Sequence, residues 1–420
     1  MTARFSQAIA LLACFPIALA AEDGRTQFIR EKVLDLFPEA VKIRRDLHRI
    51  PEPCLQETKT SQYIAAYLEK LGLEVHTGIA ETGIKAVLRG AKPGPVVGIR
   101  ADMDALPLNE DTGLTFTSEH PGFMHACGHD GHMTNVLISA KILSEMRERI
   151  AGTVVFIFQP CEEGNAEGKS GAHLMIEAGV LENPRIEAML GLHVMPEFPV
   201  GSVALRPGPL MANVVFFEVV IKGKSSHGAL PHQGIDAVHI SALAIQQFQA
   251  IISRLKDPGE RAVLSVGSIH GGTAANIISD RVVMRGTVRS FSFETENAIE
   301  KQMRNVLEGL ALTYGMEFDF EFDRASQYVH NDPELTEIIT DSFRETIGTQ
   351  NVLSTEPMTV AEDFSAFSHT IPSVFFFLGT GTKEKLHGTD FSVDEEIFKT
   401  GPLLFCTGAL RLLEHLADRN

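Results

Sequence analysis

Four side chains that bind metal ions well lie within nine residues of this chain. The segment 124–132 reads MHACGHDGH and contains His125, Cys127, His129 and His132. Cys127 and His129 are two residues apart, a spacing that lets a thiolate and a neutral imidazole reach one cation from a loop that opens a helix. A lone histidine in such a loop is usually an incidental polar group. This dense cluster instead predicts a metal site, with His125 and His132 as neighbouring or supporting groups.

Two adjacent carboxylates form the second candidate cluster. Residues 159–164 read QPCEEG, and Pro160 ends a predicted strand just before Glu162 and Glu163. Side chains of neighbouring residues diverge, so one carboxylate can bind a metal while the other faces a substrate. Paired glutamates are often a solvated turn, but their place at a strand end after the Cys-x-His cluster favours a functional role.

Short apolar runs alternate with helical patterns along the chain. Amphipathic patterns predict helices over 26–47 and 58–71, and a further helix is predicted over 131–146. Four runs are apolar on both faces, which is typical of buried parallel strands: 96–99, 153–158, 188–193 and 374–378. The chain is therefore predicted to have an α/β fold with a largely parallel central sheet.

Each chemically interesting group follows one of these four strands. Asp102 and Asp104 follow the first, the two glutamates follow the second, His193 closes the third, and His387 lies beyond the fourth. In open α/β sheets, ligands bind at the carboxyl ends of the strands. Four separate segments are therefore expected to meet in one crevice.

The pattern changes between residues 209 and 324. A βαββαβ order is predicted, which is typical of a ferredoxin-like α+β domain; its elements are 213–221, 236–255, 262–269, 281–290, 294–314 and 317–322. Residues 207–209 read PGP and mark the first linker. The predicted organisation is a catalytic metal-binding domain formed by 22–208 and 325–420, interrupted by an inserted domain at 209–324.

Composition and the first residues limit the function and the location. The 420 residues carry a formal net charge of -17 and a pI near 5.4, which argues against nucleic-acid binding. No later run reaches the ~20 apolar residues that a membrane span needs. Residues 1–21 resemble a secretory signal, with an Ala18-Leu19-Ala20 cleavage pattern. The chain is therefore expected to be exported, periplasmic or secreted, after cleavage near Ala20/Ala21.

The cysteines beyond this segment are too few for a disulfide scaffold in a chain of this size. They are Cys54, Cys127, Cys161 and Cys406. If Cys127 binds metal, at most two of the other three can pair. Their spacing does not say which.

A series of motifs, in order, resembles the metal-dependent amidohydrolase family of hippurate hydrolases, N-acyl-amino-acid amidohydrolases and indole-acetyl-amino-acid hydrolases. The motifs are RRDLHRIPEP, IRADMDALP, MHACGHDGH, FQPCEEG, GLHV, GKSSHGALPHQGIDAV, GGTAANII, GTVRSF, AEDFSAF and LHGTDF. The resemblance extends over nearly all of the chain beyond residue 21. It implies a metallopeptidase-like catalytic domain with a ferredoxin-like dimerisation (lid) domain.

The resemblance also implies a role for each site residue. It implies a centre of two divalent metal ions bound by Cys127, His129, Glu163, His193 and His387. Glu162 would be the catalytic carboxylate. Asp102 stands where related metallopeptidases carry a metal-binding histidine, and we expect Asp102 and Asp104 to support the site rather than bind metal.

The inserted domain is expected to complete the active site. By resemblance, His227 reaches across a homodimer and stabilises the oxyanion, a task that suits an imidazolium N–H. Asn276 and Arg289 match positions that grip the free carboxylate of the substrate. Two departures from the family pattern stand out: Cys161, a thiol near the metals that is open to oxidation, and Ser279, which replaces a common proline.

These observations predict an exported, dimeric metallohydrolase that cleaves the amide bond of N-acyl or N-aroyl amino acids. A dipeptidase or carboxypeptidase acting on short peptides would use the same metals and the same carboxylate grip. A non-catalytic protein that binds metal or small acids is the alternative outside the enzymes. The metal stays open, because a thiolate favours zinc whereas imidazole and carboxylate also suit manganese, cobalt or nickel.

Overall fold

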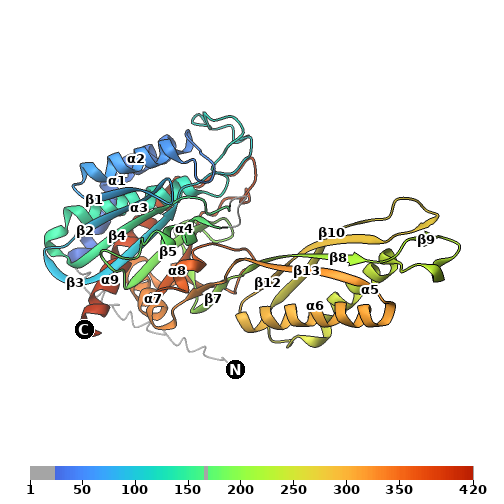
Figure 1. Cartoon of the computed structure of the whole chain (residues 1–420). Helices are drawn as coiled ribbons and strands as arrows, with labels where there is room; N and C mark the ends of the chain where they lie inside the picture. Colours follow the sequence, from blue (N-terminus) through green and yellow to red (C-terminus); the bar gives the residue numbers. More distant parts are fainter. Residues whose placement is uncertain (1–23, 165–168, 420) are drawn as a thin grey trace, which may run out of the picture.

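Two bodies joined by a narrow connection make up the computed structural model, which describes residues 24–164 and 169–419 (Figure 1). The larger body contains an eight-stranded sheet, and the narrower body contains a four-stranded sheet. The predicted signal segment lies outside the described residues. No helix among those residues is long and apolar enough to cross a bilayer.

The eight-stranded sheet has the order β1-β2-β4-β3-β5-β16-β6-β15. The strands are β1 (Glu74–Ile79), β2 (Gly83–Arg89), β3 (Lys92–Asp102), β4 (Ala151–Gln159), β5 (Ala188–Met195), β6 (Val203–Leu205), β15 (Val352–Ser354) and β16 (Ser373–Gly379). The four predicted strands correspond to β4, β3, β5 and β16, which are neighbours and mutually parallel. The flanking β2 and β6 pair with this group in antiparallel fashion, so the whole sheet is mixed.

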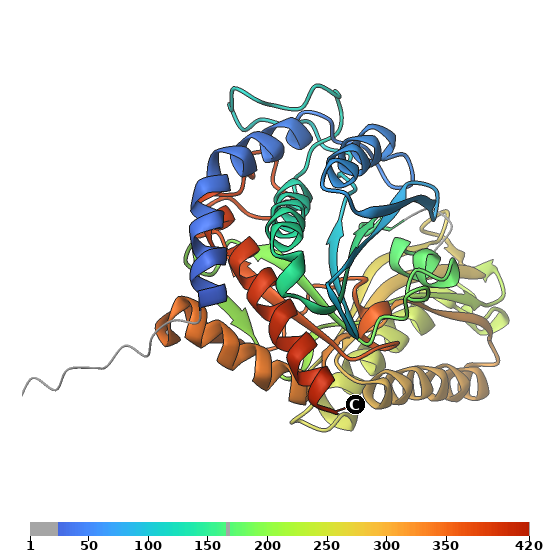
Figure 2. The ribbon, with the colours of Figure 1, turned by 90° about the vertical axis from the view of Figure 1, so that its left-hand side faces the viewer.

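Helices cover both faces of this sheet. Five helices pack on one face: α1 (Gly24–His48), α2 (Thr58–Lys70), α3 (His129–Glu145), α7 (Pro333–Ile347) and α9 (Gly401–Arg419). Figure 2 shows α1, α3 and α9 in blue, teal and red on the same side. The short helices α4 (Gly171–Glu177) and α8 (Ser365–Ser368) pack on the other face.

Strand β16 shows why the central strands are apolar throughout. Val374, Phe376 and Leu378 pack against the five-helix face, whereas Phe375 and Phe377 pack against the opposite core. Successive side chains of a strand point to opposite faces, so a strand covered on both sides buries all of them.

The narrower body is the predicted ferredoxin-like insert. Its elements are β8 (Val214–Lys222), α5 (Ala237–Ala250), β10 (Ala262–Gly271), β12 (Arg281–Ser290), α6 (Phe293–Tyr314) and β13 (Glu317–Ser326). All strand pairs in the order β10-β12-β8-β13 are antiparallel. The segment 251–255, predicted as the end of one helix, instead forms a π-helical turn after α5.

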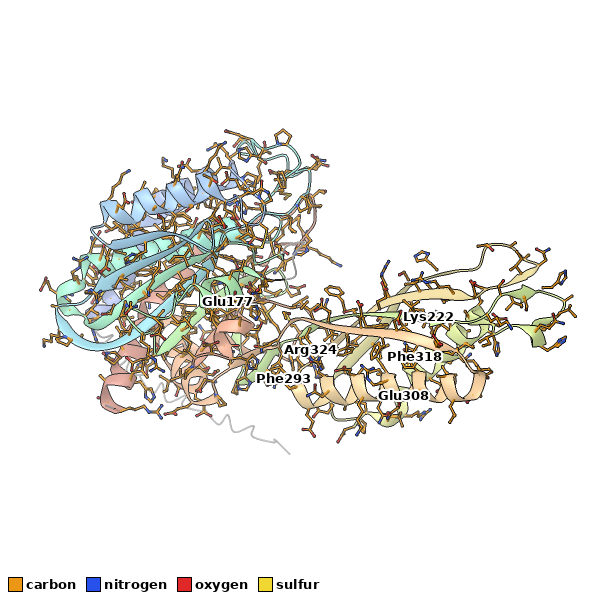
Figure 3. All side chains as sticks on the ribbon, viewed as in Figure 1. Glu177, Lys222, Phe293, Glu308, Phe318 and Arg324 are labelled. Atoms are coloured by element: carbon orange, nitrogen blue, oxygen red, sulfur yellow. A yellow bond between two sulfur atoms is a disulfide. The ribbon has the colours of Figure 1, made fainter. Side chains whose placement is uncertain are left out.

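Short ribbons mark the two ends of the insert. β7 (Gly208–Met211) pairs with β14 (Val329–Asn331) where the chain enters and leaves the insert, and β9 (Ser226–His227) pairs with β11 (Ile277–Ile278) at the far end (Figure 1). Arg324, labelled near the junction in Figure 3, bonds to Glu296 and Glu300 of α6. These ion pairs connect β13, the last strand of the insert, to α6.

Candidate metal centre and active site

A tight turn at Gly128 brings the start of α3 against β5. Gly128 has a φ of +89°, and a Cβ at this position would lie 2.5 Å from Cγ2 of Val194. Only glycine combines this conformation with such a close approach. Helix α3 begins at the next residue, His129, so Cys127 and His129 both face the strand that carries His193.

Cys127 lies between two histidines. Its Sγ atom is 3.3 Å from Nε2 of His193 and 3.3 Å from Nε2 of His387. Nδ1 of His193 donates a hydrogen bond of 2.6 Å to the carbonyl oxygen of Val194. This bond fixes the tautomer and leaves the lone pair of Nε2 directed at the thiol, as metal-binding histidines require.

His129 is also oriented for metal binding by a hydrogen bond from its Nδ1 atom. Its Nδ1 donates to the carbonyl oxygen of Asp104 at 2.8 Å, and its buried Nε2 has no hydrogen-bond partner among the described residues. Burial lowers the pKa of His129, but the charge of Asp102 and the contacts with Asp104 outweigh that effect and raise it to about 10. The surroundings therefore favour positive charge at this ring, which a bound cation would supply.

Glu163 and His387 complete the ligand cluster. Oε1 of Glu163 lies 3.4 Å from Nε2 of His387. Burial raises the pKa of Glu163, but the hydrogen bond from His387 and the charge of His129 outweigh it and lower the pKa overall. His387 has a φ of +64°, a strained conformation for a non-glycine residue that is typical of functional sites.

The five predicted ligands form two sets that share Cys127. One set is Cys127, His129 and His193, the other is Cys127, Glu163 and His387, and within each set the ligand atoms lie within 4.8 Å of one another. Burial and the charge of Glu163 raise the pKa of the Cys127 thiol well above its usual value, so its thiolate needs a nearby cation. One thiolate, one carboxylate and three imidazoles therefore fit a pair of divalent ions.

Asp102 and His132 support this cluster from behind. Oδ1 of Asp102 accepts from Nδ1 of His132 at 2.6 Å, and Nε2 of His132 accepts from the backbone N–H of Val194 at 2.9 Å. Both ring nitrogens of His132 are thus engaged. Nearby His125 is buried, outside the ligand sets, and has no hydrogen-bond partner among the described residues.

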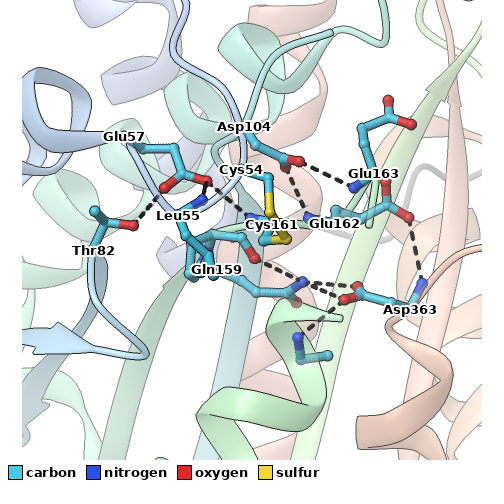
Figure 4. The surroundings of a disulfide bond; sticks show 12 residues. Cys54, Leu55, Glu57, Thr82, Asp104, Gln159, Cys161, Glu162, Glu163 and Asp363 are labelled. Atoms are coloured by element: carbon cyan, nitrogen blue, oxygen red, sulfur yellow. Dashed lines mark hydrogen bonds between the residues drawn. A yellow bond between two sulfur atoms is a disulfide. The ribbon is translucent and has the colours of Figure 1, made fainter. Parts of the chain in front are cut away.

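Asp104 holds the turn that carries the two glutamates. Its two carboxylate oxygens accept hydrogen bonds from the backbone N–H groups of Glu162 at 2.9 Å and Glu163 at 3.0 Å (Figure 4). Both oxygens are therefore engaged by the chain itself. Asp104 positions the Glu162 and Glu163 backbone, in agreement with the supporting role expected from the sequence.

Arg100 organises a buried network that the sequence reasoning did not assign. Its guanidinium bonds to Asp102 at 2.8 Å, to Glu362 at 2.8 Å and to Asp363 at 2.9 Å, and its Nε bonds to Gln159. Burial lowers the pKa of Arg100, but these carboxylates outweigh it and raise the pKa overall. The sequence feature that could have pointed to this network is the AEDFSAF motif, which contains Glu362 and Asp363.

Glu162 lies beside the ligand cluster and close to this network. Its Oε1 accepts from the backbone N–H of Asp363 at 3.4 Å. Burial, together with the charges of Glu362 and Glu163, raises the pKa of Glu162 well above its usual value. A carboxylate in these surroundings accepts a proton readily.

A cavity of about 860 Å³ joins the ligand cluster to the insert. Residues of both bodies line it, among them Cys127, Glu162, Glu163, His193 and His387 from the larger body and Phe216, Arg289 and Asp323 from the insert. The structure therefore places Arg289 in the same cavity as the predicted metal ligands. Its half-buried guanidinium has a pKa lowered by burial.

His227 and Asn276 lie together but outside this cavity. The backbone N–H of Gly228 donates to the carbonyl oxygen of Asn276 at 2.8 Å, and His227 pairs with Ile277 in the β9–β11 ribbon. Both side chains are exposed at the far end of the insert. Neither reaches the cavity of its own chain, so their predicted roles require a second copy of the protein.

The prediction that Cys161 is a free thiol near the metals is wrong. Cys161 forms a disulfide with Cys54, and Figure 4 shows this bond beside Glu162. The segment 51–57 lies against the end of β4, which brings together two sulfur atoms that are 107 residues apart in the sequence. The free cysteines of the described chain are Cys127 and Cys406, both buried.

Comparison with known proteins agrees with this architecture. Residues 98–409 match the family model described as Peptidase family M20/M25/M40. A solved Bacillus subtilis structure, described as a dinuclear metal-binding peptidase from the M20 family, superposes with a TM-score of 0.80 at 35% identity and covers 91% of this chain and 99% of its own. The chain therefore belongs to peptidase family M20/M25/M40, and it is a hydrolase of that family.

Two curated relatives show which activities occur among similar chains. N-acetylcysteine deacetylase of Bacillus subtilis (strain 168) is 38% identical over 375 residues, which cover 89% of this chain and 97% of the relative. Thermostable carboxypeptidase 1 of Saccharolobus solfataricus is 37% identical over 382 residues, which cover 89% of this chain and 95% of the relative. Similarity to this chain thus extends to proteins named as deacetylases and as carboxypeptidases.

Proposed function

We propose that this protein is an exported, dimeric amidohydrolase that cleaves N-acyl or N-aroyl amino acids into a carboxylic acid and an amino acid. One observation carries the proposal: a single cavity contains four of the five predicted ligands, the carboxylate of Glu162 and the guanidinium of Arg289. The name of the deacetylase relative supports an acyl amino acid as the substrate class. The Cys54–Cys161 disulfide supports export, because disulfides persist in oxidising compartments.

The residues of the chain divide the chemistry of amide hydrolysis among them. Two divalent ions held by the ligand cluster would supply positive charge that acidifies a water molecule and polarises the substrate carbonyl. Glu162 takes the proton of the attacking water and delivers it to the leaving nitrogen. Asp104 keeps Glu162 in place through its backbone N–H, and the backbone N–H of Asp363 contacts its carboxylate.

Arg289 is suited to bind the free carboxylate of the substrate. Its Nη1 contacts the carbonyl oxygen of Asn213 at 3.4 Å, and no carboxylate of the described residues forms an ion pair with it. The remaining N–H groups of the planar guanidinium can form two parallel hydrogen bonds with a carboxylate. This grip would hold the amide bond over the ligand cluster.

Changing Arg289 to Met is expected to raise KM about 10- to 100-fold for an N-acyl amino acid, since a hydrogen bond to a charged group contributes about 1.5–3 kcal/mol. Steady-state kinetics on the N-acyl amino acid and on its carboxamide analogue would measure this. The carboxamide analogue is the control, and its KM should rise much less in the variant. An equal rise of KM for both substrates would show that Arg289 does not recognise the substrate carboxylate.

A substrate screen tests the proposed activity directly. The purified protein, loaded in turn with Zn, Mn, Co or Ni, would be assayed on hippurate-like conjugates, N-acetyl amino acids and dipeptides. We expect the acyl conjugates to give the highest kcat/KM. Preference for dipeptides would instead favour a dipeptidase or carboxypeptidase, as one relative is named. Stoichiometric metal without any hydrolysis would favour a binding protein.

Mixing two inactive variants tests the proposed homodimer. In the proposal, each active site combines Glu162 of one chain with His227 of the other. E162Q and H227A should each be inactive, whereas a heterodimer of the two has one site with both native residues. Random mixing should therefore restore about a quarter of the native activity. No recovery, or a monomer by light scattering, would contradict a role for His227 in trans.

A further inference from the structure

The Cys54–Cys161 disulfide lies directly beside the turn that carries the two active-site glutamates. Cys54 belongs to the segment 51–57 between α1 and α2, and Cys161 follows the end of β4. Glu162 and Glu163 are the next two residues after Cys161 (Figure 4). A covalent bond therefore holds the residue that directly precedes the two glutamates in the chain.

The backbone at Cys161 needs such support. Cys161 has a φ of +55°, a left-handed conformation that is unfavourable for any residue other than glycine. Its N–H donates to Oε1 of Glu57 at 3.0 Å, and its carbonyl oxygen accepts from the N–H of Gly171 at 2.9 Å. The surrounding contacts thus maintain a conformation that the residue alone would leave.

The segment 51–57 contacts two segments of the active site, the one that contains Asp104 and the turn that carries Glu162 and Glu163. The carbonyl oxygen of Glu52 accepts from the N–H of Ala105 at 2.9 Å, next to Asp104. Asp104 in turn accepts from the N–H groups of Glu162 and Glu163. The segment, Asp104 and the glutamate turn therefore form a closed ring of contacts, and the disulfide is its covalent link.

We propose that the Cys54–Cys161 disulfide is a positioning element for Glu162 and Glu163, so that turnover and metal retention depend on its oxidised state. This inference rests on the roles proposed above for the two glutamates. Cys161 is buried and Cys54 is partly exposed, so a reductant would approach the disulfide from the side of Cys54. A phosphine and one water molecule convert the disulfide into two thiols and the phosphine oxide, which balances the two-electron reduction.

The double variant C54A/C161A tests the proposal, with C406A as the matched control. Cys406 is buried in α9 and lies outside the ligand sets and the cavity. The melting temperature of each protein would be measured first. Then kcat and KM at saturating metal, and bound metal after dialysis, would be measured well below that temperature. We expect kcat to fall about tenfold or more with little change in KM, since small displacements of catalytic groups carry large penalties. Bound metal should fall too.

Treatment with a phosphine provides a second measurement if the double variant does not fold. Native protein should lose kcat and bound metal on reduction, and measuring kcat at saturating metal controls for removal of metal by the reagent itself. The proposal is overturned if reduced native protein or the folded double variant keeps kcat and metal content within about twofold of C406A. Metal content is measured without substrate, so a failure of the proposed amidohydrolase activity remains distinguishable.

Discussion

Replacing Glu162 with glutamine is expected to lower kcat at least about 100-fold while leaving the metal content unchanged, because general acid–base catalysis contributes about 10²–10⁴-fold. The amide has nearly the same volume and still presents an oxygen to the backbone N–H of Asp363. It does not accept the proton of the attacking water. Steady-state kinetics and elemental analysis of the dialysed protein would measure the two effects separately.

The neighbouring substitution E163Q is the control for this experiment. Glu163 contacts His387 and lies in a ligand set with Cys127, so a neutral amide at this position should weaken metal binding as well as activity. The two variants should therefore differ in metal content although both lose activity. Native turnover by E162Q would refute the role of Glu162.

Replacing Arg100 with methionine is expected to destabilise the protein by about 3–5 kcal/mol, because it leaves buried carboxylates without their cation. Asp102, Glu362 and Asp363 each contact the Arg100 guanidinium, and all four side chains are buried. Methionine fills much of the same volume but supplies no charge. Denaturant unfolding of the native protein and of the variant would measure the difference.

The loss caused by R100M should grow as the pH rises. Burial raises the pKa of Asp363 to about 7 even with Arg100 present, whereas an unfolded chain has an aspartate pKa of about 3.9. Between these values the folded state keeps a proton that the unfolded state releases, so stability falls with rising pH. Without Arg100 the pKa of Asp363 in the folded state rises further. The free energy of unfolding should therefore fall more between pH 5 and pH 8 in R100M than in the native protein.

The matched control is R285M, which removes an exposed arginine that pairs with Glu218 on the insert. Exposed ion pairs contribute about 0–1 kcal/mol, so this variant should unfold nearly as the native protein does. An equally small loss in R100M would show that the buried network contributes little to stability.

The sequence predicted much of the fold and the strand ends where candidate ligands meet, because both depend on local patterns, whereas the complete ligand set was implied by the resemblance of the motifs to a known family. Runs such as 374–378 are apolar on both faces and identify buried strands without knowledge of their neighbours. The chain order then placed Glu163, His193 and His387 after such strands, and parallel strands bring their carboxyl ends to one edge. The antiparallel strands at both sides of the parallel group have no comparable apolar run in the sequence, so their pairing was not predicted.

Contacts between distant segments had no such pattern to predict them. Nothing in the spacing of four cysteines distinguishes Cys54–Cys161 from the other pairings, because the choice depends on where the segment 51–57 packs. The same holds for Arg100, whose partners Glu362 and Asp363 are more than 260 residues away. In a motif, a buried arginine looks no different from an exposed one.

The residues by themselves predicted the order of the main strands and helices along the chain and the clusters of potential metal ligands at strand ends. The resemblance of the motifs to a known family implied the five ligands, the role of Glu162 and the class of chemistry. Hydrophobic periodicity and the types of the side chains are properties of neighbouring residues, so they can be read along the chain. Only the tertiary structure decided the disulfide partner of Cys161, the carboxylates around Arg100, and the separation of His227 and Asn276 from the cavity. Each of these depends on distances between segments that the path of the folded backbone sets.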